Sequence, residues 1–477
     1  MRPAPSPSKQ ATLSRVTTYT ILRLSLLGCL LPNLGLLPPC GAQSTGDAMS
    51  QHFAAAQDSL RHGDQERAER EYKAFLGEAI HRVANARARA GDLSAAEKSY
   101  VDALSFTGPD SDARLDYASV LFDQSRWNDA GSVAQSVVDV DPGDIRARVL
   151  LGRIFFEQKD YAAAKLQFEA ALTHGALNEV WRLLSITYLR LQDLEHARSL
   201  LQRVITSLGD KPANHVAVAM TYYDGDYPDQ AIAELKAELL RDPAAPAAHY
   251  DLGLAYLARN EEAGYPKAIP EFRAQLKLDP DDFPSRYMLA HIALKQRNFD
   301  EAELELKRAV ALNAQDRSTQ LLLGQLYSET HRAALAEDVL RTLIASSDPA
   351  EPDYQLVRAH YMLGRTLQLS GKVEDGTREI KEAERLRKQM RLTVAETSAS
   401  RVQSQVAMES ESVHSGQPRA TAQEKAQAHA FVRRIGPAIA ESYYNLGKIA
   451  SLRNDSGVAA QYLQKAIEWD PSLAPKP

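Results

Sequence analysis

The sequence has few cysteines, and this scarcity excludes several kinds of site. Its 477 residues include two cysteines, Cys29 and Cys40, and both lie in the apolar N-terminal region. The rest of the chain therefore has no disulfide, no thiolate metal site and no cysteine nucleophile. We expect neither a metal ion nor a cofactor.

Positive charge is not in excess either. The net charge is −6, and residues 1–42 carry four basic residues and no acidic one. Without that segment the chain has 52 basic against 62 acidic residues. Broad binding to nucleic acid needs clustered lysine and arginine, so we expect no nucleic-acid partner.

Signatures of catalysis are missing as well. The chain contains no GxxxxGK[ST] phosphate loop, no HExxH, no GxSxG and no CxxC motif. No alternating strand pattern offers a site for a nucleotide-binding or hydrolase domain. We therefore expect no catalytic residue and predict that the protein is not an enzyme.

The N-terminus has the three parts of a secretory signal peptide. Basic residues come first, residues 21–37 are apolar, and small residues precede Gln43. We predict a signal peptide over residues 1–42, cleavage after Ala42 and a linker over 43–48, which would place the protein in the periplasm or outside the cell. An uncleaved membrane anchor and lipid attachment at Cys29, which follows Leu-Leu-Gly, remain alternatives. Membrane contact would come only through this segment.

A phrase of two apolar residues, glycine, two variable residues and a further apolar position recurs along the chain. Twelve residues after the glycine comes a small residue, and four residues later a large apolar one, as in Gly152, Ala164 and Phe168. Most copies close with Asp-Pro or a close relative. The glycines of the phrase are Gly152, Gly253, Gly324, Gly364 and Gly447.

This spacing resembles the tetratricopeptide repeat, in an exported bacterial protein. The resemblance implies an all-α fold, a right-handed α-α superhelix of about ten helix–turn–helix units. We predict degenerate units over 49–110, a main array over 111–390, an extended helix and flexible linker over 391–437, a C-terminal unit over 438–473 and a disordered tail over 474–477.

The pattern also predicts how one unit packs. Gly152 and Ala164 are small because the two helices of the unit cross there, and a larger side chain would force them apart. Three extra residues within 259–266 predict a longer surface loop between two helices. Pro437 predicts a break between a helix over 423–434 and the last unit.

In this family the first helix of each unit lines a concave groove, and ligands usually lie there. The resemblance therefore implies a non-catalytic scaffold in the cell envelope that binds a protein or peptide. The alternative is an accessory subunit of an envelope enzyme or of a secretion complex. Arginine and tyrosine are frequent at binding hot spots. The predicted groove residues are four arginines in a basic patch and four tyrosines in an aromatic stripe: Arg146, Arg153, Arg182, Arg190, Tyr223, Tyr250, Tyr287 and Tyr361. Two other interpretations are that the tyrosines pack between adjacent first helices and that the arginines are solvated or pair with acids on neighbouring units.

Overall fold

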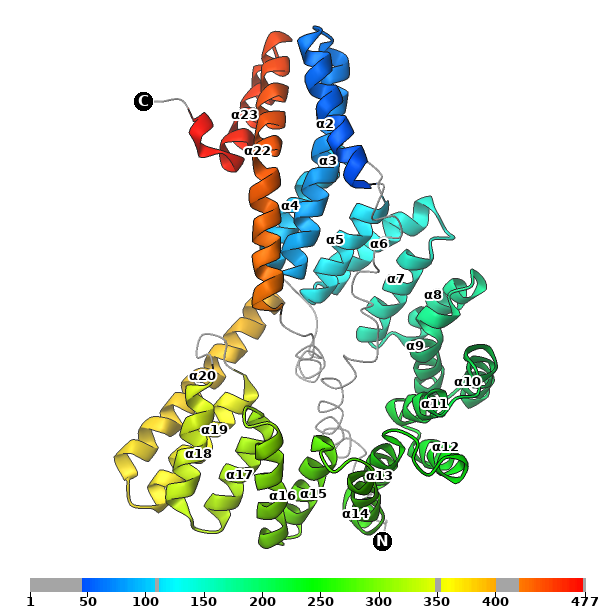
Figure 1. The fold of residues 1–477 in the computed structure, drawn as a ribbon, viewed down its shortest axis with the longest axis vertical. Coiled ribbons are helices and arrows are strands. Elements are labelled where there is room, and N and C mark those ends of the chain that lie inside the picture. Colours follow the sequence, from blue (N-terminus) through cyan, green and yellow to red (C-terminus); the bar gives the residue numbers. More distant parts are fainter. Residues whose placement is uncertain (1–44, 108–110, 348–352, 400–419, 475–477) are drawn as a thin grey trace, which may run out of the picture. The chain divides into compact units, whose positions relative to one another are not determined.

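Aspartate or asparagine is the N-cap residue of many of the helices, and its side chain binds a backbone N–H of the first turn. The Asp144 carboxylate accepts the backbone N–H of Ala147 at 2.9 Å, and the Asp160 carboxylate accepts that of Ala163 at 3.0 Å. These side chains satisfy N–H groups that the first turn of a helix leaves unpaired. The computed structural model describes residues 45–107, 111–347, 353–399 and 420–474, and every regular element in these ranges is a helix (Figure 1). The predicted all-α fold is confirmed.

The chain divides into two compact units. What we call the terminal unit combines residues 45–201 with residues 420–474, so it contains both ends of the described chain. Its helices are α2 (Thr45–Arg61), α3 (Gln65–Arg89), α4 (Leu93–Thr107), α5 (Ser111–Asp123), α6 (Trp127–Val140), α7 (Ile145–Glu157), α8 (Tyr161–Thr173), α9 (Leu177–Arg190), α22 (Ala422–Leu452), α23 (Ser456–Trp469) and the short 3₁₀ helix η1 (Pro471–Leu473).

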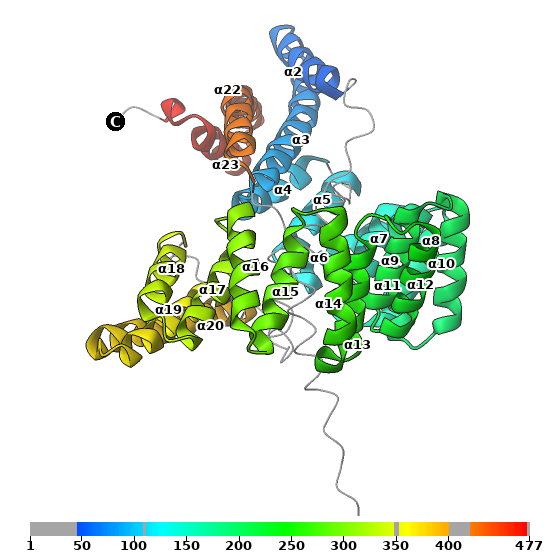
Figure 2. The same cartoon turned by 60° about the horizontal axis from the view of Figure 1, so that its bottom comes forward.

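The middle unit is one continuous stretch, described over residues 202–347 and 353–399. Its successive helices stand side by side, as Figure 2 shows for α13 to α16. They are α11 (Pro212–Asp224), α12 (Pro228–Arg241), α13 (Ala248–Arg259), α14 (Glu261–Leu278), α15 (Phe283–Lys295), α16 (Phe299–Leu312), α17 (Arg317–Glu329), α18 (Ala333–Ala345), α19 (Tyr354–Leu369) and α20 (Val373–Ala399). Helix α10 (Leu194–Leu208) spans the boundary between the units.

The glycine of each repeat lies where its two helices touch. A Cβ atom on Gly152 would lie 2.5 Å from the ring of Phe168, and one on Gly324 would lie 2.7 Å from the Leu340 side chain. Both partners stand sixteen residues after the glycine, at the large apolar position of the repeat phrase. The predicted close crossing is therefore confirmed, and the apolar side chain above the glycine fills it.

The insertion within residues 259–266 does not lengthen a loop, which corrects our prediction. Helix α13 ends at Arg259 and α14 begins at Glu261, so the extra residues add a turn to α14. Asn260 caps this turn, since its side chain accepts the N–H of Ala263 at 3.1 Å. A Cβ on Gly264 would lie 2.5 Å from the carbonyl oxygen of Tyr256, so the added turn packs directly on α13.

Within the described residues, each Asp-Pro pair follows the second helix of a repeat and forms the turn that ends it. The Asp141 carboxylate accepts the N–H of Gly143 at 2.9 Å, and the Asp242 carboxylate accepts that of Ala244 at 3.0 Å. An aspartate that binds its own backbone two residues later stabilises a turn, and proline cannot continue the helix. This pair therefore ends one repeat and starts the next.

The C-terminal repeat completes the core of the N-terminal helices. Helix α22 lies beside α3 (Figure 1). Ile439, Tyr443 and Leu446 of α22 pack in one apolar cluster with Tyr72 and Ile80 of α3. Polar contacts fix the register of this packing. The Asn445 amide donates to the Tyr72 hydroxyl at 2.9 Å, the Lys465 ammonium binds both Asp102 carboxylate oxygens at 2.9 Å, and Arg453 pairs with Glu69.

The predicted break at Pro437 does not occur, and α22 runs unbroken from Ala422 to Leu452. A proline inside a helix costs about 3 kcal/mol. Phe431 and Ile435 before the proline and Ile439 and Tyr443 after it pack into the same cluster, so burial on both sides offsets that cost. The predicted linker over 391–437 is thus helical up to Ala399 and again from Ala422. Residues 400–419 and 475–477 lie outside the described residues.

The glycine crossing gives a stability prediction. Gly253→Ala should lower the free energy of unfolding by about 1–3 kcal/mol, because its Cβ would lie 2.6 Å from the Phe272 ring. Gly131→Ala in α6 is the matched control, since its nearest neighbour would be 3.8 Å away. The control should be neutral or stabilising by up to about 1 kcal/mol through helix propensity. Chemical denaturation followed by circular dichroism measures both, and equal effects would contradict the crossing.

The shared core predicts a coupling between the two ends of the chain. Tyr443→Ala removes a ring that is 2 % exposed and should cost about 3 kcal/mol or more. Hydrogen exchange should then rise in α3 as well as in α22, and stay unchanged in α15 to α18. Tyr361→Ala, at a ring that is 50 % exposed, serves as the control. Faster exchange in α22 and α23 with α3 still protected would show that the ends are not coupled.

Candidate binding surface

Arg146 is already paired in the terminal unit. Its guanidinium on α7 donates to Asp112 at 2.6 Å and to Asp116 at 3.2 Å, both on α5. Burial raises the pKa of Asp116, but hydrogen bonds from His81 and Asn85 and the charge of Arg146 outweigh it and leave this pKa below its usual value. Arg146 thus joins neighbouring repeats, as our interpretation of paired arginines expected.

The other three arginines of the predicted patch differ in their surroundings. Arg153 lies on α7 with its guanidinium 4.8 Å from the centre of the Phe122 ring on α5. Burial lowers its pKa. Arg182 and Arg190 lie on α9, where Arg182 is partly exposed and Arg190 is exposed. All four therefore lie on two first helices of the terminal unit, and two of them also hold α7 against α5.

The four predicted tyrosines lie in the middle unit and are unequally exposed. Tyr223 is 8 % exposed and Tyr250 is 4 % exposed, and the Tyr250 ring packs 5.7 Å from the Phe272 ring. Tyr287 is partly buried and stacks on His291 at 6.4 Å, and burial raises its pKa to about 12. Tyr361 is 50 % exposed. Of the predicted stripe, Tyr223 and Tyr250 therefore serve packing, and Tyr361 presents the most surface.

Tyr361 belongs to a row along α19 that we call the α19 stripe, whose members are exposed except for the partly buried Arg358. Its members, Tyr354, Arg358, Tyr361, Arg365 and Leu369, follow one another at intervals of three or four residues and so share one face of the helix. Tyr354 is 69 % and Leu369 is 75 % exposed. The opposite face buries Leu356, Ala359, Leu363 and Leu367 in the core. The row extends about 22 Å at 1.5 Å per residue.

Two arginines give the α19 stripe its charge. Arg358 donates to the side-chain oxygen of Gln325 on α17 at 3.0 Å. Arg365 is exposed and makes no ion pair within the described part of the chain. Sequence reasoning identified Tyr361 in this row but missed Tyr354 and Leu369. The spacing along the predicted helix would have revealed both.

The described residues bear on metal binding and on membrane crossing. Within these ranges no group of three or more histidine, cysteine, aspartate or glutamate residues is placed to hold a metal ion. No described helix is both long and apolar enough to cross a bilayer. Two histidines at equivalent positions of neighbouring repeats each contact an acidic residue. His249 contacts Glu271 at 2.7 Å, and His215 contacts Asp210 at 2.6 Å.

His291 makes the stability of the middle unit dependent on pH. Burial, with the positive charge of Lys295 second, lowers its pKa from 6.5 to about 4, while Glu261 acts in the opposite direction and Arg358 in the same one. Between these values the unfolded chain binds the proton and the folded chain does not, so stability falls as the pH drops from 6.5 toward 4.

Acidification from pH 7 to pH 5 should therefore lower the free energy of unfolding by about 2 kcal/mol through His291. His291→Gln should remove that part of the pH dependence. Urea unfolding of both proteins at pH 7 and pH 5 tests this, with His331→Gln at an exposed turn as the control. The same acid-induced loss in wild type and His291→Gln would contradict the assignment.

Comparisons with known proteins agree with the repeat pattern. Models of the tetratricopeptide repeat match residues 81–145, 115–179, 149–213, 219–283, 265–326 and 440–473. No curated protein matches the sequence. Three similar solved structures are a MamA RS-1 double mutant, YrrB, and a tetratricopeptide repeat protein from Parabacteroides merdae.

The similarity to each structure is low in sequence. The MamA mutant is 21 % identical, with 38 % of this chain and 97 % of that chain covered and a TM-score of 0.34. YrrB is 19 % identical, with 39 % and 95 % covered and a TM-score of 0.28. The Parabacteroides merdae protein is 12 % identical, with 59 % and 98 % covered and a TM-score of 0.35. The repeat matches, by contrast, together cover more than half of the 477 residues. The chain belongs to the tetratricopeptide-repeat family.

Proposed function

We propose that this protein is a non-catalytic scaffold that binds a protein or peptide partner along the α19 stripe. The observation that carries the proposal is the exposure of two tyrosines and a leucine on one face of α19, at 69 %, 50 % and 75 %. Large aromatic and aliphatic side chains exposed together on one face are typical of a contact surface. Tyrosine and arginine are also the residues that contribute most at hot spots.

The shape of the surface favours an extended or helical peptide segment. One helix face about 22 Å long is narrow, so it contacts a segment and not a second large flat surface. Along the stripe, tyrosines that offer apolar contact alternate with Arg358 and Arg365, which offer positive charge. A partner segment with apolar side chains and at least one carboxylate is complementary to that order.

We further propose that the scaffold acts in the cell envelope. The support is the N-terminal sequence, with its basic start, its apolar stretch over 21–37 and its small residues before Gln43. Fractionation of cells that express the tagged chain, together with N-terminal sequencing of the mature protein, tests this. A mature chain that begins at Gln43 in the periplasmic or secreted fraction supports it, and a cytoplasmic chain that still begins at Met1 would refute it.

The role of the α19 stripe is tested by charge reversal. Arg365→Glu should weaken capture of the partner from an envelope extract at least tenfold, because it repels a carboxylate on a surface centred on Tyr361. Arg387→Glu on α20 is the control, since that arginine is also exposed and makes no ion pair among the described residues. Quantitative mass spectrometry of the captured proteins measures both. Equal capture by Arg365→Glu and wild type would exclude the α19 stripe as the binding surface.

A further inference from the structure

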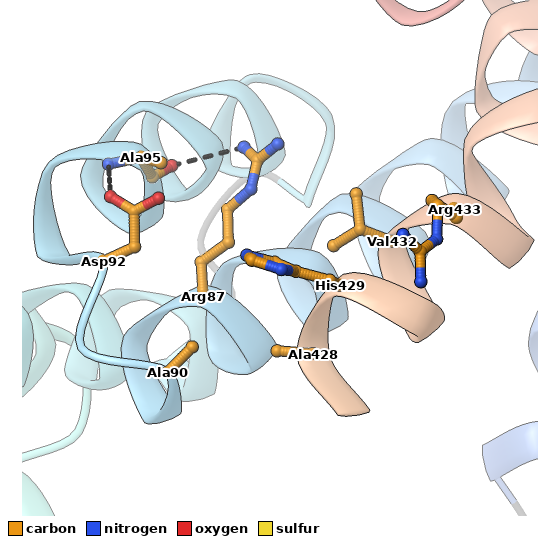
Figure 3. Close-up of a pocket in the computed structure, with 8 residues that line it drawn as sticks. All are labelled: Arg87, Ala90, Asp92, Ala95, Ala428, His429, Val432 and Arg433. Carbon is orange, nitrogen blue, oxygen red and sulfur yellow. Dashed lines mark hydrogen bonds between the residues drawn. The ribbon is translucent and has the colours of Figure 1, made fainter. Parts of the chain in front are cut away.

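A cavity opens in the terminal unit where α22 crosses the turn between α3 and α4. Its volume is about 290 Å³. One wall consists of Arg87, Ala90, Asp92 and Ala95, and the other of Ala428, His429, Val432 and Arg433 (Figure 3). Sites for drug-sized ligands span about 300–1,000 Å³, so this cavity has room for one side chain or one chain end and not for a nucleotide.

The lining of the cavity combines apolar side chains with nitrogen-bearing ones. Ala90, Ala95, Ala428 and Val432 supply methyl groups from both walls. The arginines and His429 supply nitrogen donors, and Figure 3 shows the His429 ring beside the stem of Arg87. Asp92 is the single acid of the lining, and its carboxylate already accepts the N–H of Ala95 at 3.1 Å. The unbalanced charge of the lining is therefore positive.

Arg87 is the strongest indication of an anionic ligand, because its guanidinium is half-buried and forms no ion pair. One terminal nitrogen donates to the Ser99 hydroxyl at 2.7 Å and to the Ala95 carbonyl at 3.4 Å, and both acceptors are neutral. Its guanidinium also lies 5.6 Å from the centre of the Trp469 ring. No carboxylate of the described chain lies within ion-pair distance of Arg87. Burial lowers its pKa, and the more distant charges of Asp92 and Asp102 offset only part of that effect. A half-buried cation without an ion pair gains stability when an anion binds beside it.

A histidine and a further arginine stand on the opposite wall. His429 and Arg433 are one helical turn apart on α22, both are exposed, and neither makes an ion pair among the described residues. Their spacing of four residues places both side chains along the same edge. The cavity is thus bounded by cations from two segments that are more than 330 residues apart in the sequence.

We propose that this cavity binds a carboxylate carried on a short apolar group, with the apolar part against the four alanine and valine side chains and the carboxylate among Arg87, His429 and Arg433. This chemistry is that of a peptide ending in an apolar residue such as leucine. It is also that of a glutamate side chain within a peptide. The surface is separate from the α19 stripe, and its ligand need not be the same partner.

Binding at this place has a structural consequence. The two walls come from the N-terminal and C-terminal segments of the terminal unit, so the cavity exists only while α22 is packed on α3. A ligand that binds this arrangement and not the separated one stabilises it by mass action. Ligand binding should therefore slow hydrogen exchange in α22 and in the last turn of α3.

The test uses the full chain and three labelled hexapeptides in fluorescence anisotropy. The first is Gly-Gly-Gly-Gly-Ala-Leu with a free C-terminal carboxylate, the second is its C-terminal amide, and the third is Gly-Gly-Glu-Leu-Gly-Gly as an amide. We expect a carboxylate peptide to bind at least tenfold more tightly than the neutral amide. Tighter binding of the first peptide assigns the site to chain ends, and tighter binding of the third assigns it to glutamate side chains.

Substitutions on α22 locate the binding. Arg433→Glu should weaken binding about tenfold or more, and Arg433→Lys should retain part of it. Arg434→Glu is the matched control, because this neighbouring exposed arginine carries the same charge and does not line the cavity. Arg365→Glu on α19 should also leave peptide binding unchanged, which separates this proposal from the proposed function.

Thermal denaturation of each variant shows that loss of binding is not loss of folding. The proposal is overturned if the neutral amide binds as tightly as both carboxylate peptides. It is equally overturned if Arg433→Glu and Arg434→Glu weaken binding to the same extent.

Discussion

Two helices of a repeat come into direct contact here because a glycine on the first leaves room for one large side chain of the second. Phe168 lies over Gly152, Phe272 over Gly253 and Leu340 over Gly324. This contact sets the distance between the helices of a hairpin, and the hairpin in turn presents a fixed apolar face to the next one. The helix-to-helix contact at the glycine fixes the direction of each first helix. The direction of α19 in turn decides which of its faces is exposed. The α19 stripe is therefore a consequence of core geometry in α19 and α20, where Gly364 lies against Ile380.

The core of each repeat was predictable because the residues that form it recur at a fixed spacing in the sequence. The sixteen residues from glycine to its apolar partner appear in four of the five copies, and the nineteen residues from Gly253 to Phe272 located the insertion. What the insertion does was not predictable by the same means. Asn260 and Gly264, which convert the extra residues into a helical turn against α13, are as common in loops as in helix caps.

The candidate site was only partly predictable, for two physical reasons. The face of a residue follows from the helical period, but its exposure depends on neighbouring helices, so Tyr250 at 4 % and Tyr361 at 50 % look alike in sequence. The polar pair that joins the two helices of a repeat also differs in residue type from one repeat to another. His249 with Glu271, Arg286 with Glu305 and His360 with Glu379 join the two helices of three different hairpins. The packing of α22 on α3 had no sequence signal at all, because a repeat pattern specifies contacts between neighbours in the chain.

The order of synthesis gives the shared core of α3 and α22 a further meaning. The middle unit is one continuous stretch and has all its parts once residue 399 has been made. The terminal unit starts first, yet its apolar cluster around Tyr72 still lacks Tyr443 and Leu446 at that point. At roughly 5–20 residues per second, more than 350 residues separate the two halves of this cluster by roughly 20–70 seconds. A growing chain therefore carries an incomplete apolar surface until its last helices emerge, a state in which chaperones still have access to it.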